Sequence, residues 1–254
     1  MTARTASLTA ALALGLVGCG GRIHEVSIET PLQPKLDISA FSRILIAGFV
    51  AGGTDEVDAN LETARLLRSQ LRNRPDLQIV ETDVLSLAEM VADGSVASGF
   101  GDVVPLMDPA EITQEQDLEA YERVFADIGF WKQLGEEHQD PLIVTGTVLF
   151  TPHARAGFIT QEQETYDSFG RRRVVPVRAY RERRGYVLSP KFIFIDGRTG
   201  TTLYSESHRE EVLYDAQQNT PALSSYFELM DRLIPTFLSA LSTQTIRGTR
   251  ILLR

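Results

Sequence analysis

The pattern of apolar residues at the start of the chain's main body limits the possible folds more than any other feature. Residues 43–50 form an almost continuous apolar run, which predicts a strand buried on both faces. Two glycines break the run, and a helical stripe follows, with Asp58 placed to cap the helix; the stripe comprises Val57, Leu61, Ala64, Leu67 and Leu71. Residues 77–81 then predict a short strand. This order is typical of a βαβ unit, so we expect an α/β fold.

A helical insertion is expected over residues 83–140. Residues 83–93 predict a short helix capped by Asp83, and a second helix is predicted to begin at Asp108. Its apolar stripe runs through Leu118, Tyr121, Phe125, Ile128 and Trp131. Trp131 is the only tryptophan of the chain. We expect it to anchor the core, and the alternative is a residue that stacks on a ligand.

The next part of the chain predicts strands and hairpins. Residues 142–150 repeat the pattern of a buried strand. Residues 153–188 are long, polar and β-branched in places, and they predict a β-hairpin arm that turns back at 167–171. Residues 192–214 predict a second hairpin, which turns at a Gly-Arg-Thr-Gly sequence.

The last helix has the clearest pattern. Thr220 is its predicted cap, Pro221 occupies the first turn, and a wide apolar face follows. Pro235 lies inside it and should kink it. Residues 250–254 suggest a final strand. Together these elements predict a single domain over residues 41–254, in which amphipathic helices pack on a mixed β-sheet that extends into a long β-hairpin arm.

Positive charge is concentrated on the predicted arm. Residues 171–184 hold seven of the chain's 25 basic side chains, interleaved with valines and a tyrosine. The seven are Arg171, Arg172, Arg173, Arg178, Arg181, Arg183 and Arg184. Arginine suits bidentate contacts with carboxylate or phosphate, so this stretch predicts a docking surface for a partner protein, an acidic envelope polymer or lipid headgroups. The alternative is a solvated strand face that pairs with the chain's own acids, such as Glu162, Glu164 and Glu182.

The amino terminus has the order of a secretory signal. One arginine precedes a short apolar run, and the run ends at Leu16-Val17-Gly18-Cys19, which contains the only cysteine. The run is far shorter than the ~20 residues that span a bilayer. The sequence resembles the lipobox of bacterial lipoproteins, in which the cysteine is acylated and becomes the mature first residue. The resemblance implies removal of residues 1–18, lipidation of Cys19 and, because glycine rather than aspartate follows, sorting to the outer membrane facing the periplasm. The alternative is an incidental cysteine.

Composition limits the partners of the mature chain. Removing residues 1–18 leaves 24 basic and 34 acidic side chains, a formal charge of −10, which does not suit nucleic acid. Residues 19–40 predict an acylated end and a flexible tether, punctuated by Pro31 and Pro34. The lipid would be the membrane anchor.

The sequence contains no recognisable catalytic or cofactor motif. The glycines at 48, 52 and 53 do not form a dinucleotide or phosphate-binding motif, and acids stand where a phosphate would lie. The four histidines are scattered, so we expect no metal site and no cofactor. A pair of catalytic carboxylates among the 34 acids remains open.

The order of the elements, with residues 43–50 leading into a helix and residues 192–204 containing a Thr-Gly turn, resembles a group of envelope lipoproteins. The group includes the curli-secretion pore subunit, the lipoprotein activators of peptidoglycan synthases and, as a similar domain, the amino-terminal domain of the Tol-system periplasmic protein. The resemblance covers residues 41–150 and 190–254. It implies a sandwich similar to anticodon-binding domains and a non-enzymatic role.

Three functions follow from these observations. The favoured one is an adaptor or regulator of envelope assembly or secretion that contacts an envelope protein, and association into a homo-oligomer stays open. Reversing Arg178, Arg181 and Arg183 to glutamate should then abolish partner capture. A membrane pore is disfavoured, because both faces of the arm place charge in mid-strand. The alternatives are a lipoprotein that binds a glycan or peptide through residues 95–131, and an envelope hydrolase with an unrecognised carboxylate site.

Overall fold

The computed structural model describes residues 23–73, 77–92 and 111–253. Residues 34–242 form one compact unit. The described residues before Pro34 and after Ser242 form a second unit, a terminal ribbon.

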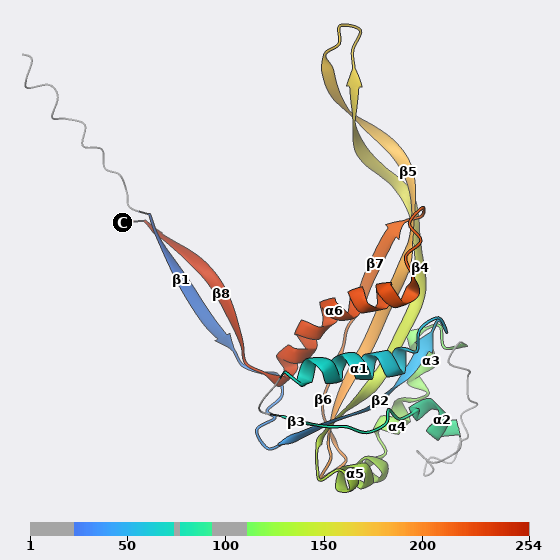
Figure 1. Cartoon of the computed structure of the whole chain (residues 1–254), viewed down its shortest axis with the longest axis vertical. Coiled ribbons are helices and arrows are strands. Elements are labelled where there is room, and N and C mark those ends of the chain that lie inside the picture. Colours follow the sequence, from blue (N-terminus) through green and yellow to red (C-terminus); the bar gives the residue numbers. More distant parts are fainter. Residues whose placement is uncertain (1–22, 74–76, 93–110, 254) are drawn as a thin grey trace, which may run out of the picture. The chain divides into compact units, whose positions relative to one another are not determined.

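A mixed β-sheet lies at the centre of residues 34–242 (Figure 1). Its strands are β2 (Arg43–Gly53), β3 (Gln78–Val80), β4 (Leu142–Tyr166), β5 (Arg172–Asp196), β6 (Thr202–Ser207) and β7 (Glu210–Asp215). The order is β3-β2-β4-β5-β6, and β7 also pairs with β5. Strand β2 is parallel to β3 and β4, whereas β5 is antiparallel to β4, β6 and β7. The predicted α/β class, mixed sheet and βαβ unit are therefore confirmed.

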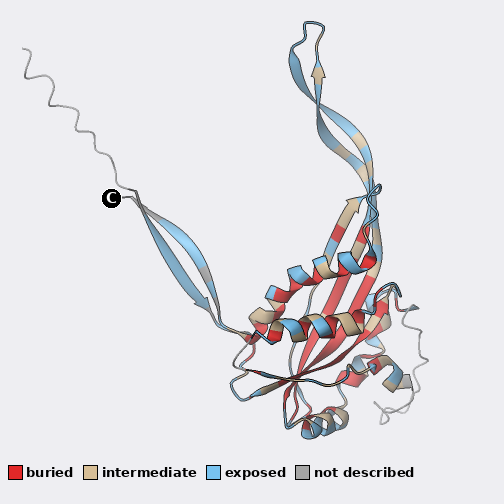
Figure 2. Cartoon of the chain, viewed as in Figure 1, coloured by how far each residue is buried: buried red, intermediate tan, exposed pale blue. Residues whose placement is uncertain are grey.

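Helices α1 (Ala59–Leu71) and α6 (Ala222–Leu241) share one hydrophobic cluster with one face of the sheet (Figures 1 and 2). The predicted cap of α1 is confirmed, because the carboxylate of Asp58 accepts a hydrogen bond from the backbone N of Leu61 at 2.9 Å. Helix α6 starts later than predicted. Pro221 is extended (φ −60°, ψ 144°) and is itself the N-cap, so Thr220 does not cap the helix.

The opposite face of the sheet packs against four short helices. These are α2 (Leu87–Ala92), α3 (Glu115–Glu119), α4 (Glu122–Phe125) and α5 (Ile128–Glu137). Trp131 is fully buried here, and its indole N–H donates to the backbone oxygen of Val124 at 2.8 Å. The ring stacks on Phe125 and meets Phe130 edge-on. Its predicted role as a core anchor is confirmed.

The helical insertion differs from the prediction in its details. Helix α2 begins at Leu87 rather than near Asp83, because the chain first runs extended beside β2, where the backbone N of Leu85 donates to the oxygen of Ala47 at 2.7 Å. The predicted start at Asp108 lies outside the described residues. The single stripe expected through Trp131 is divided among α3, α4 and α5, and Asp127 starts α5 by accepting from the backbone N of Phe130 at 3.1 Å.

Strand β6 is the last strand of the sheet on the side opposite β3. Its Glu206 accepts hydrogen bonds from Lys35 and from the hydroxyl of Tyr204. Burial by itself raises the pKa of Glu206, but these bonds together hold it below its usual range. Residues 201–214 were expected to form one run of strand, and the structure divides them into β6 and β7.

The terminal ribbon corrects the expected tether. Strand β1 (Ile23–Leu32) pairs antiparallel with β8 (Gln244–Leu253), from Ile23 opposite Leu253 to Leu32 opposite Gln244. Alternation of Glu25, Val26, Ser27 and Ile28 is a strand signal, and the prediction of a tether gave more weight to the prolines that follow. The suggested final strand is confirmed and is longer than expected.

Candidate functional site

The arm is the continuation of β4 and β5 beyond the rest of the sheet, and we define it as residues 154–184. Strand β2 leaves β4 at Phe150, and β7 leaves β5 at Arg183. The β4–β5 ladder nevertheless continues to the pair Tyr166–Arg172. At about 3.3 Å per residue, the two-stranded part is roughly 40 Å long. Figures 1 and 2 show it leaving the sheet, with no buried residue along its described length.

The tip of the arm is ordered by one carboxylate. Oδ1 of Asp167 accepts from the backbone N of Phe169 and of Arg171, both at 2.9 Å, and Oδ2 accepts from Nε of Arg171 at 2.9 Å. Gly170 has a φ of +73°, a conformation that glycine adopts without strain. The bonds to Arg171 and Phe169 hold the pKa of Asp167 below its usual range. The predicted turn at 167–171 is confirmed.

The structure divides the seven predicted arginines into two groups. Five contact carboxylates: Arg171 pairs with Asp167, Arg172 with Glu164, Arg184 with Glu182, and both Arg181 and Arg183 with Asp215. The other two, Arg173 and Arg178, have no carboxylate partner among the described residues. The guanidinium of Arg178 instead lies 5.3 Å from the centre of the Phe158 ring. Exposed ion pairs are weak, typically below ~1 kcal/mol, so these arginines can exchange partners.

Two details of this pairing were not predicted. Asp215 holds the base of the arm, since its carboxylate accepts from Nη1 of Arg181 at 3.0 Å, and it comes from β7 rather than from the arm. Glu162, which was expected to pair, has no ion-pair partner among the described residues. Only the β5–β7 register could have placed Asp215 beside Arg183.

One face of the arm is aromatic. The register places Phe158 opposite Tyr180, and their rings meet edge-on with centres 5.3 Å apart. Tyr166 lies on the same face, because it is an even number of residues from Phe158 along the strand. Phe158 and Tyr180 are 66% and 62% exposed. Large aromatic side chains this exposed are typical of interaction surfaces. Alternation of side chains along residues 154–166 was the signal that would have identified this face.

The arm also differs in charge from the rest of the chain. It contains eight arginines and four acidic residues, a formal charge of +4, whereas the whole chain carries −9. The remainder therefore carries −13. Positive charge separated in this way favours an acidic partner.

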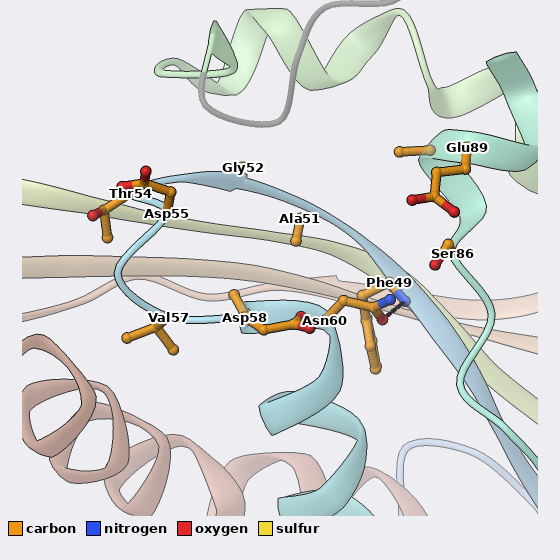
Figure 3. Close-up of a pocket in the computed structure, with 12 residues that line it drawn as sticks. Phe49, Ala51, Gly52, Thr54, Asp55, Val57, Asp58, Asn60, Ser86 and Glu89 are labelled. Atoms are coloured by element: carbon orange, nitrogen blue, oxygen red, sulfur yellow. Dashed lines mark hydrogen bonds between the residues drawn. The ribbon is translucent and has the colours of Figure 1, made fainter.

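A cavity of about 330 Å³ lies at the end of β2 (Figure 3). Asp55, Asp58 and Glu89 contribute carboxylates to its lining, around an apolar floor that includes Phe49. The Asn60 amide is already bonded: its oxygen accepts from the backbone N of Phe49 at 2.7 Å, and its nitrogen donates to the oxygen of Leu85 at 3.0 Å. The carboxylates oppose phosphate binding here, in agreement with the absence of a nucleotide motif.

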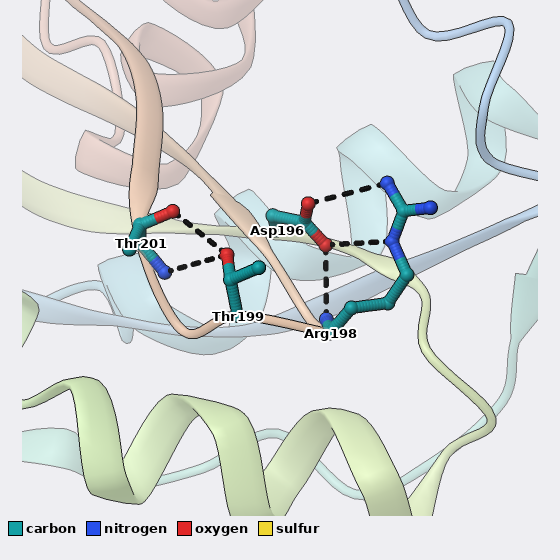
Figure 4. Close-up of polar contacts among 4 residues, drawn as sticks. All are labelled: Asp196, Arg198, Thr199 and Thr201. Atoms are coloured by element: carbon teal, nitrogen blue, oxygen red, sulfur yellow. Dashed lines mark hydrogen bonds and ion pairs between the residues drawn. The ribbon is translucent and has the colours of Figure 1, made fainter.

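The turn between β5 and β6 has a structural role (Figure 4). Asp196 accepts from the backbone N of Arg198 at 2.9 Å and from its guanidinium at 3.2 Å. The Thr199 and Thr201 hydroxyls are 2.7 Å apart, within hydrogen-bond distance. The polar side chains of this turn therefore form hydrogen bonds with one another and stabilise the turn.

The structure also bears on a metal site, a membrane-spanning helix and a site for a glycan or peptide. Within the described ranges no three His, Cys, Asp or Glu side chains could hold a metal together. No described helix is long and apolar enough to cross a membrane. Of the region expected to bind a glycan or peptide, residues 95–110 lie outside the described part, and Trp131 is buried and so cannot stack on a ligand. Cys19 also lies outside the described residues.

Comparisons with known proteins find structural neighbours only. No family model matches the chain, and no curated protein sequence matches it. The structure is similar to that of lipoprotein GNA1162 from Neisseria meningitidis, with 11% identity, a TM-score of 0.34, and coverage of 78% of this chain and 98% of the other. It is also similar to the hypothetical protein CT253 from Chlamydia trachomatis, with 10% identity, a TM-score of 0.37, and coverage of 78% and 95%. Likenesses this weak carry no argument about function, and the resemblance to the envelope lipoprotein group stays a prediction.

Proposed function

We propose that the chain is a lipoprotein of the bacterial outer membrane, anchored through Cys19 and facing the periplasm, and that it acts as a non-enzymatic adaptor or regulator in envelope assembly or secretion. Its arm binds an acidic surface of an envelope protein. The lipobox pattern supports the anchor, and the arm supports the binding role. Metal, cofactor and nucleic acid have no part in this proposal.

The observation that carries the proposal is the arm's combination of unpaired strand edges, exposed aromatic rings and positive charge. Tyrosine, phenylalanine and arginine are the side chains enriched in protein interfaces, and Phe158, Tyr180 and Arg178 lie together on one face. No described strand pairs with β4 beyond Phe150 or with the other edge of β5 beyond Arg183, so the backbone groups along these edges can offer a partner strand further hydrogen bonds.

A bilayer-spanning role fits the arm poorly. A strand that crosses lipid needs one continuously apolar face. The register places Arg178 and Glu182 on the aromatic face and Arg181 and Arg183 on the other. Each face therefore carries charge in its middle, and a protein partner accommodates that charge better than lipid does.

The ion pairs of the arm decide which arginines should be substituted to test its role. Arg181 and Arg183 hold Asp215, so changing them also loosens the base of the arm. Arg173 and Arg178 are the better targets, because neither has a carboxylate partner among the described residues. The double variant Arg173→Gln/Arg178→Gln removes two charges without disturbing an ion pair.

The control is Arg65→Gln/Arg72→Gln, which removes two exposed charges on and directly after α1, together with their ion pairs to Glu62 and Glu81. Cross-linking in intact cells followed by affinity capture and mass spectrometry reads out the partner. We expect one acidic envelope protein that the full chain and the control capture and the arm variant loses. Equal capture by both variants would refute the role of the arm. Cross-linked dimers or larger species of the purified chain would show in the same gels whether copies associate.

The anchor has its own test. Cys19→Ala should abolish incorporation of labelled fatty acid such as palmitate and should release the body from the outer-membrane fraction. Persistent labelling of the variant would contradict lipidation at Cys19, and this result would leave the arm experiment unaffected.

A further inference from the structure

A second cavity, of about 390 Å³, lies between the sheet and helices α3 and α4, where the chain passes from β6 to β7. It is separate from the arm and from the cavity of Figure 3, with which it shares no lining residue. Its walls have opposite chemistry. Acidic side chains come from the two helices, and hydroxyl and basic side chains come from the strands and from the β6–β7 connection.

The floor of this cavity is polar where a buried sheet face is normally apolar. Further along the same strands, Ile143 and Ile193 lie in the cluster around Trp131. Thr147 and Ser189 share their face by strand alternation, yet they are only 5% and 7% exposed. The hydroxyl of Thr147 has no hydrogen-bond partner among the described residues. Because Thr147 lines the cavity, its hydroxyl can bond to a polar group of a ligand there.

The charges around the cavity are set in opposed pairs. Lys191, directly opposite Thr147 in the ladder, pairs with Glu122 of α4. Arg209 donates to Glu115 of α3 at 3.2 Å and to the hydroxyl of Ser189 at 3.4 Å. These pairs are partly or fully exposed, so a ligand can replace one member at little cost. Glu119, also on α3, has no ion-pair partner among the described residues.

These features select the chemistry of the ligand. Three carboxylates against two cations give the lining a formal charge of −1 with histidine neutral. A simple anion would be repelled by the three carboxylates, and a simple cation would be repelled by the two basic groups. Among the described residues that line the cavity there is no phenylalanine, tyrosine or tryptophan to form a stacking platform for a sugar ring. A molecule with an ammonium at one end and a carboxylate at the other satisfies both walls.

We propose that this cavity binds a short peptide with free amino and carboxyl termini. The carboxylate lies against Lys191, Arg209 and the hydroxyls of Thr147 and Ser189, and the ammonium lies against Glu119. The proposal does not depend on the arm, so either can fail alone.

The test is calorimetric titration of the full chain in detergent with L-alanyl-L-alanine. Its N-acetyl and C-amide derivatives each remove one terminal charge. We expect saturable binding of the free dipeptide and roughly tenfold weaker binding of each blocked form, the size of one lost charge-assisted bond. Glu119→Gln should weaken binding of the free dipeptide but leave the N-acetyl form unaffected, because that form lacks the ammonium.

Thr147→Val keeps the shape of the side chain and removes its hydroxyl, and it should weaken binding about 3- to 10-fold. Thr160→Val, the same change on the exposed arm, is the matched control. No saturable binding below ~10 mM, or equal binding of the free and blocked dipeptides, would overturn the proposal. So would acetate or ethylamine binding as tightly as the dipeptide. If Thr147→Val fails to fold, Glu119→Gln decides the question, since Glu119 is exposed.

Discussion

The hydroxyl of Tyr226 ties α6 to α1 through a buried polar contact, and its removal gives a measurable prediction. The side chains of Tyr226 and Thr63 are fully buried and their hydroxyls are hydrogen-bonded to each other. Both hydroxyls also lie within hydrogen-bond distance of the backbone oxygen of Ala59, at 3.2 Å from Tyr226 and 2.5 Å from Thr63, so their two protons are shared among these three contacts. Burial raises the pKa of Tyr226 above its usual value, so the phenol keeps its proton at neutral pH.

Tyr226→Phe removes one hydrogen bond and leaves no cavity, because the ring keeps its place. The expected loss is about 1 kcal/mol of unfolding free energy, the net value of one such bond. Thr63→Val should cost a similar amount, since Tyr226 can still donate to Ala59. The double variant should cost about 0.5–1 kcal/mol less than the sum, because the two residues share one interaction.

Urea unfolding followed by the fluorescence of Trp131 is the assay. Trp131 is the only tryptophan, and it is buried on the opposite face of the sheet, so it reports unfolding of the whole sandwich. With a slope of 2–3 kcal/mol/M, the midpoint should fall by about 0.3–0.5 M while the slope stays unchanged. Strictly additive effects of the two substitutions would refute the shared bond, and no effect of Tyr226→Phe would refute the reasoning altogether.

Three further predictions concern packing, pH and the tip of the arm. Gly135→Ala places a Cβ 1.9 Å from the backbone oxygen of Gly197 and should cost roughly 1–3 kcal/mol in urea unfolding, whereas Gly129→Ala on the same helix, with its nearest contact at 3.4 Å, should not destabilise. Because the pKa of Glu206 is lowered on folding, the stability it contributes is present above its unfolded pKa of about 4.3 and is lost as the pH falls through the folded value. Glu206→Gln should therefore narrow the gap between unfolding midpoints at pH 7 and pH 3.5, and an unchanged gap contradicts this. Asp167→Asn should accelerate amide hydrogen exchange at the tip but not in β6, and equal exchange at the tip would show that the carboxylate does not order the turn.

Local patterns predicted most of the sheet, because its central strands are buried on both faces. The run from Ile44 to Val50 is fully buried, and so is Leu142–Phe150, and each could be assigned without knowledge of its neighbours. The parallel pairing of β2 and β3 followed from the helix between them. The arm was predictable because its turn sequence around Gly170 interrupts a long run of strand-forming residues.

The errors arose where contacts distant in the sequence decide local structure. The strand β1 depends on pairing with β8 at the far end of the chain, and no short-range signal specifies that partner. Similarly, Asp215 meets Arg181 only because β7 pairs with β5. The cavity between the sheet and helices α3 and α4 combines side chains from α3, α4, β4, β5 and the end of β6 with the β6–β7 connection, and none of these segments carries a motif of its own.

The same long-range pairing bears on the binding role that we propose for the arm. Where β7 accompanies β5, Gly185 is buried, and a Cβ there would lie 1.9 Å from the backbone oxygen of Val212, so the base of the arm is tightly packed. Beyond Asp215 the described part of the arm consists of β4 and β5 alone, and a two-stranded ribbon by itself is marginally stable in water. A partner that adds a strand or covers Phe158 and Tyr180 would supply the contacts that the ribbon lacks. The arm's exposed apolar surface is costly in the free chain, and this cost is what a bound partner would remove.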